Sequence, residues 1–149
     1  MQLPHYLAAL VTAERRLADG YDQVTRAHAG VADVALTSRS FAEASRARAD
    51  ALAAACEDRY PGGTDEGAPA SFATAQPGPL ALLSDLAELA RLAGFVHTAW
   101  EVVVQAASGL RDRDLLSEAQ QNVSALETEA AWIDHKTKSE AAQAVLVAE

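Results

Sequence analysis

A carboxylate interrupts the apolar face of the first segment that is predicted to be helical. Alternating steps of four and three residues from Leu3 reach apolar side chains at most positions, but the middle of the series is Glu14. The other side of this segment is polar or charged, so Glu14 belongs to the buried face. The series is Leu3, Leu7, Leu10, Glu14, Leu17, Tyr21, Val24 and His28.

The next helical segment carries a cation at a corresponding place. Arg48 stands on a face made otherwise of apolar and small residues. In a helical hairpin that closes at residues 30–33, positions equally far from the turn lie at one level, which places Arg48 opposite Glu14. A carboxylate and a guanidinium in the same core layer most simply form an ion pair.

His97 and Glu101 could do chemistry of another kind. They stand four residues apart in "HTAWE", so one helix face presents both. An imidazole and a carboxylate at this spacing can bind a metal ion together. The simpler interpretation is a histidine that is hydrogen-bonded to a neighbouring carboxylate.

The direction of the third helix decides which groups approach Glu14. If a long connection starts this helix at the far end of the bundle, His97 lies at the level of Glu14, with Glu101 and Asn122 at the margin. We therefore expect a buried polar layer of Glu14, Arg48 and His97. With the other topology, the residues at this level would be Glu88 and Glu127.

Four long helices are predicted to hold these groups, over residues 4–29, 34–60, 79–108 and 112–138. Residues 61–78, rich in glycine, proline and alanine, form a loop that could span the bundle. The tail, residues 139–149, is partly apolar and is expected to dock on an apolar surface. The sequence thus predicts one all-α domain over residues 1–149, an antiparallel four-helix bundle.

Composition narrows the functional classes. The formal charge of −9, without a cluster of lysine and arginine, opposes binding to nucleic acid. No apolar run approaches the length of about 20 residues that a membrane helix needs. Cys56 is the only cysteine, so no internal disulfide forms. We expect a cytoplasmic protein without a signal peptide.

The pattern resembles the ferritin-like superfamily, and most closely the small bacterial ferritin-like bundles of the YciF type. The resemblance covers about 4–138 and rests on four long helices, the long middle connection and Ala13-Glu14 midway along the first helix. It implies a long crossover between the second and third helices, and a di-metal site of two carboxylates and two Glu-x-x-His motifs. Glu14 matches one carboxylate, but Glu-x-x-His is absent and Arg48 stands where a histidine ligand is expected. The implied metal site is therefore degenerate.

Three hypotheses of function follow. The leading one is a non-catalytic interaction or scaffold protein that binds a protein partner or forms a homodimer, without catalytic residues, metal or cofactor. The second is an oxidoreductase or iron-handling protein with a metal on Glu14, His97 and Glu101, which requires Arg48 to point away. The third is a bundle that binds a small anionic or apolar ligand, with Arg48 as its anchoring cation.

Overall fold

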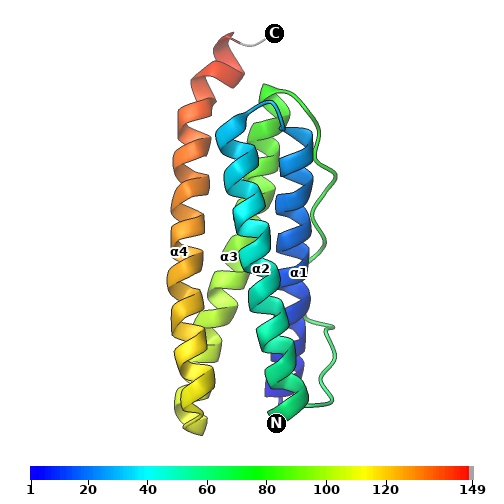
Figure 1. Cartoon of the computed structure of the whole chain (residues 1–149), viewed down its shortest axis with the longest axis vertical. Helices are drawn as coiled ribbons and strands as arrows, with labels where there is room; N and C mark the ends of the chain where they lie inside the picture. Colours follow the sequence, from blue (N-terminus) through cyan, green and yellow to red (C-terminus); the bar gives the residue numbers. More distant parts are fainter. Residues whose placement is uncertain (148–149) are drawn as a thin grey trace.

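The computed structural model describes residues 1–147, and these residues contain four long helices and no strand (Figure 1). The all-α class predicted from the sequence is confirmed. The helices are α1 (Leu3–Ala27), α2 (Ala32–Arg59), α3 (Pro79–Leu110) and α4 (Arg113–Ala142), followed by the π-helix η1 (Gln143–Val147).

The helix ends follow local signals in the sequence. Pro79 lies in the first turn of α3, where its missing N–H is no loss. Arg111 ends α3 in the left-handed conformation, with φ of 57°. The Asp112 side chain then caps α4 by accepting a hydrogen bond from the backbone N–H of Leu115 at 3.1 Å.

The fourth helix is longer than the sequence suggested. It continues through the first residues of the expected tail to Ala142, because Ser139-Glu140-Ala141-Ala142 contains no glycine or proline that would end it. Lys136 adds an ion pair to Glu140, one turn further on, at 2.8 Å. The tail is therefore helical over most of its length.

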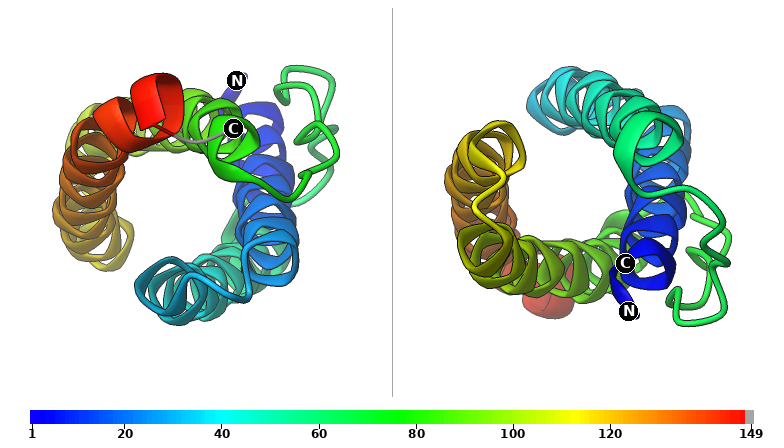
Figure 2. Two further views of the ribbon diagram at one scale, coloured as in Figure 1. Left: turned by 90° about the horizontal axis from the view of Figure 1, so that it is seen from above. Right: turned by 90° about the horizontal axis from the view of Figure 1, so that it is seen from below.

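The helices surround one core in the order α2, α1, α3, α4, as the views along the bundle show (Figure 2). Polar contacts between helix ends fix their relative positions. His28, which follows α1, donates from Nε2 to Asp85 near the start of α3 at 2.7 Å. Lys136 of α4 donates to Asp33 near the start of α2 at 2.7 Å.

The connecting segment, residues 61–78, lies along the outside of α1 (Figure 1). At one end the Thr64 backbone N–H donates to His5 Nδ1 at 3.0 Å. At the other end the Ala75 N–H donates to the Gln23 side chain at 3.1 Å. Other contacts between them are Thr12 to Asp65, Arg16 to Pro69, and Phe72 on Gly20. The segment therefore passes most of the length of α1.

The end of the chain differs from the expectation that the apolar tail docks. Ala144 is buried, but Val145, Leu146 and Val147 have exposed fractions of 62%, 80% and 64%. The last part of the expected tail, residues 148–149, lies outside the described residues. Within residues 1–147, no helix is both long and apolar enough to cross a membrane.

Candidate functional site

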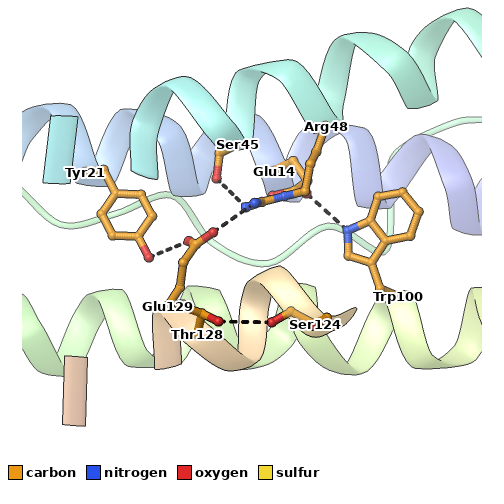
Figure 3. Close-up of polar contacts among 8 residues, drawn as sticks. All are labelled: Glu14, Tyr21, Ser45, Arg48, Trp100, Ser124, Thr128 and Glu129. Atoms are coloured by element: carbon orange, nitrogen blue, oxygen red, sulfur yellow. Dashed lines mark hydrogen bonds and ion pairs between the residues drawn. The ribbon is translucent and has the colours of Figure 1, made fainter. Parts of the chain in front are cut away.

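Glu14 and Arg48 meet in the core, between α1 and α2 (Figure 3). Arg48 donates from Nε to Glu14 Oε2 at 2.5 Å and from Nη2 to Glu14 Oε1 at 3.1 Å. Exposure is 0% for Glu14 and 7% for Arg48. The carboxylate thus takes a two-point, charge-assisted contact from one edge of the guanidinium.

Neighbouring residues on all four helices complete this ion-pair layer (Figure 3). Arg48 also donates from Nη1 to Glu129 of α4 at 2.8 Å, and from Nη2 to Ser45, one turn earlier on α2, at 2.9 Å. Trp100 Nε1 of α3 donates to Glu14 Oε2 at 3.1 Å. Tyr21 of α1 donates its phenolic proton to Glu129 Oε1 at 2.7 Å.

The ion-pair layer holds one cation and two carboxylates. Four of the five N–H groups of Arg48 have an acceptor in Glu14, Glu129 or Ser45. The formal charge of Glu14, Arg48 and Glu129 together is −1 when both carboxyls are ionised. Such a layer is satisfied in its hydrogen bonds but is not neutral.

Burial and these bonds shift the proton affinities of the layer. Burial raises the pKa of Glu14, and the hydrogen bonds from Arg48 and Trp100 oppose that rise. Burial and the adjacent Glu129 carboxylate raise the pKa of Tyr21 well above its usual value, so its phenol remains a donor. Burial disfavours the cationic form of Arg48, but the bonds with Glu14 and Glu129 outweigh it and raise its pKa.

This arrangement suits a structural role better than a chemical one. Both oxygens of Glu14 accept hydrogen bonds, and a guanidinium carries no lone pair that could bind a metal ion. Arg48 points into the layer, whereas the metal hypothesis required it to point away. Its bonds to Glu14 and Glu129 also leave it poorly placed to anchor an anionic ligand, as the third hypothesis required.

His97 does not belong to the buried layer, contrary to the expectation. Its side chain is 26% exposed, with Nδ1 at 3.0 Å from Glu101 and Nε2 at 3.5 Å from Glu127. The buried face of α3 runs through Val96 and Trp100, so that His97 lies at its edge. The structure therefore separates Glu14 from His97 and Glu101, the three residues of the metal hypothesis.

The other residues considered for the layer also lie elsewhere. Glu88 pairs with Arg91 on the surface of α3 at 2.9 Å. The Asn122 Nδ2 atom is buried without a hydrogen-bond partner. Asn122 is not among the residues to which Arg48 is hydrogen-bonded. Among residues 1–147, no group of three histidine, cysteine, aspartate or glutamate side chains is arranged to hold a metal ion.

Sequence reasoning missed Glu129, Tyr21 and Trp100 as polar members of the layer. A signal for Glu129 was present, because it falls in the α4 face at the same alternating spacing that singled out Glu14 in α1. That face is Leu115, Ala119, Leu126, Glu129, Ile133 and Lys136. For Tyr21 and Trp100 the signal is weaker: each has one polar atom that needs a partner when the ring is buried.

Comparisons of the chain with known proteins do not identify a family. No protein-family model, curated protein or solved structure matches it.

Proposed function

We propose that this chain is a non-catalytic, ferritin-like bundle that acts as an interaction or scaffold protein in the bacterial cytosol. In this proposal the layer that holds two metals in ferritin-like proteins is replaced by an ion-pair layer. The observation that carries it is the position of Arg48, which is hydrogen-bonded to Glu14 on one side and to Glu129 on the other.

The course of the chain supports an antiparallel bundle with a long crossover. The connecting segment contacts α1 from His5 to Gln23, so it returns from one end of the bundle to the other. The contact of His28 with Asp85 places the end of α1 beside the beginning of α3. Ferritin-like folds have a long crossover of this kind, so these contacts support the proposal.

The energetics of the layer support a structural role. Burying three charged groups requires that each be paired, and here every charged group has at least two hydrogen bonds. The bonds join all four helices, through Glu14 and Tyr21 on α1, Arg48 on α2, Trp100 on α3 and Glu129 on α4. A layer of this kind selects one packing of the four helices.

An apolar end of the bundle supports a role in protein contacts. This apolar end comprises exposed residues near the start of α2, the start of α3 and the end of the described chain: Leu36, Leu80, Val145, Leu146 and Val147, each at least 62% exposed. Single exposed apolar residues are common, but five near one end favour a contact surface. We propose that a second copy of the chain covers it, giving a homodimer.

Sedimentation velocity tests this part of the proposal. Wild type is expected to sediment as a dimer, and Leu80→Glu as a monomer because it places a charge in the apolar end. Leu110→Glu is the matched control, since Leu110 is 48% exposed at the opposite end of the same helix. A monomeric wild type, or an equal effect of both variants, would contradict a dimer through this surface.

A further inference from the structure

A cavity of about 580 Å³ opens between α1, α3 and the connecting segment, away from the residues of the ion-pair layer. Its volume is within the range of small-molecule sites. Buried apolar side chains, Ala9, Leu10 and Ala99, line it. Tyr6 and Phe95, each 37% exposed, add two aromatic rings to the lining. We refer to this hollow as the α1–α3 cavity.

The lining of the α1–α3 cavity carries negative charge but no positive charge. Glu66, on the connecting segment, is the only lining residue with a formal charge at neutral pH, and neither lysine nor arginine lines the cavity. No ion pair or hydrogen bond to another described residue engages the Glu66 carboxylate. The whole chain carries −9, so its field also attracts cations and repels anions.

The connecting-segment wall of this cavity is held in place. Gly63 packs so closely on the backbone of Pro4 that a Cβ atom there would overlap the Pro4 carbonyl group. The next residue, Thr64, donates its backbone N–H to His5 at 3.0 Å. A wall fixed before binding spares a ligand the entropy of ordering it.

We propose that the α1–α3 cavity binds a small organic ammonium ion with an aromatic or aliphatic body. The body packs on Leu10 and Ala99 and beside the ring of Phe95, and the ammonium group pairs with the Glu66 carboxylate. The aromatic rings add cation–π attraction to the charge pair. This inference does not depend on the ion-pair layer or on dimer formation.

Three ligands of similar size but different charge test the proposal. They are 2-phenylethylammonium, 2-phenylethanol and 3-phenylpropanoate, each titrated into the full-length protein. Binding is followed by NMR, through the methyl resonances of Ala9, Leu10 and Ala99, whose side chains line this cavity. The cation is expected to bind most tightly, the alcohol less tightly and the anion least.

Variants separate the charge from the apolar contacts. Glu66→Gln should weaken binding of the cation by about twofold to fivefold, the range for a solvent-exposed charge pair, and leave the alcohol unchanged. Glu43→Gln, which removes an exposed carboxylate from α2, is the matched control and should change neither. Ala99→Leu should weaken both ligands, because the larger side chain fills the cavity.

Three results would overturn the proposal. One is the absence of methyl shifts from all three cavity residues on titration of the cation into wild type. Another is equal affinity of wild type for cation, alcohol and anion. The third is a Glu66→Gln variant that binds the cation as tightly as wild type does. None of these results would bear on the proposed dimer, which sedimentation tests separately.

Discussion

Replacing Arg48 by methionine removes the single cation of a layer that buries two carboxylates. Glu14 and Glu129 would then face each other's charge without the guanidinium that bonds to both. Removing one partner of a buried ion pair costs about 3–5 kcal/mol, a large part of the roughly 5–15 kcal/mol that keeps a domain folded. Because two carboxylates lose their cation here, we expect the upper part of this range.

Glu14→Gln should be much milder. It leaves Arg48 paired with Glu129 and bonded to Ser45, and it removes the excess negative charge of the layer. The glutamine oxygen can still accept one N–H, so that the loss is about one charge-assisted hydrogen bond, or roughly 1.5–3 kcal/mol. The expected order of stability is wild type, then Glu14→Gln, then Arg48→Met.

Urea unfolding, followed by circular dichroism and tryptophan fluorescence, measures these differences. Arg39→Met, an exposed arginine on the same helix, is the control and should change stability little. Combining Glu14→Leu, Arg48→Met and Glu129→Leu should recover part of the loss of Arg48→Met, since no buried charge remains, while the Tyr21 hydroxyl and Trp100 Nε1 lose their acceptors. If Arg48→Met were no worse than Glu14→Gln, or the triple variant no better than Arg48→Met, the charge argument would be refuted.

Three further predictions concern pH, the tyrosine of the layer and the connecting segment. The pKa of Glu14 is raised, which means that the native state binds the carboxyl proton of Glu14 more tightly than the unfolded chain does. The contribution of this difference to the free energy of unfolding is complete below the ordinary carboxyl pKa. It is lost as pH rises through the raised pKa. In urea unfolding at increasing pH, the stability advantage of wild type over Glu14→Gln should therefore shrink, and an advantage that grows would contradict this. Tyr21→Phe should cost about 1–3 kcal/mol in the same assay, because Glu129 Oε1 loses its donor; an unchanged midpoint would show that this bond contributes nothing. Gly63→Ala should lower the melting temperature because its methyl group would overlap Pro4, whereas Gly30→Ala, with open space around it, should not; equal melting temperatures would mean that the segment moves freely aside.

The hairpin of α1 and α2 could be read from the sequence because its geometry is simple. A tight turn joins the two helices, so residue spacing alone set Glu14 opposite Arg48, and the structure places these two side chains in contact. The clear separation of apolar and polar faces in α1 also identified Glu14 as buried. Both arguments use local spacing and need no knowledge of the other helices.

The third helix could not be oriented in the same way. Leucine, valine and alanine occur on nearly every side of α3, so several of its faces are compatible with a buried series. The prediction that put His97 in the buried layer is rotated by part of a residue step from the observed buried face. This small rotation moves His97 to the edge of the core and puts Trp100 on Glu14. An apolar surface that covers most of a helix leaves its rotation to the packing of its neighbours.

The fourth helix shows a different limit. Counting from the turn before α4 placed Asn122 at the level of Glu14, but Glu129, two turns further on, supplies the carboxylate. The long side chain of Arg48 reaches across that distance, and Tyr21 holds Glu129 from the other side. Counting residues along each helix predicts which backbone positions lie at the same height in the bundle. It does not predict contacts between long side chains whose backbones lie at different heights.

The metal content of the purified protein tests the central claim most directly, namely that an ion pair has taken the place of a metal site. Wild type and Glu14→Ala would be purified from cells grown with added iron, manganese and zinc, and analysed side by side by elemental mass spectrometry. The account predicts that neither protein holds metal near one equivalent, because Arg48 engages both Glu14 and Glu129. Near-stoichiometric metal in wild type that is lost in Glu14→Ala would contradict it.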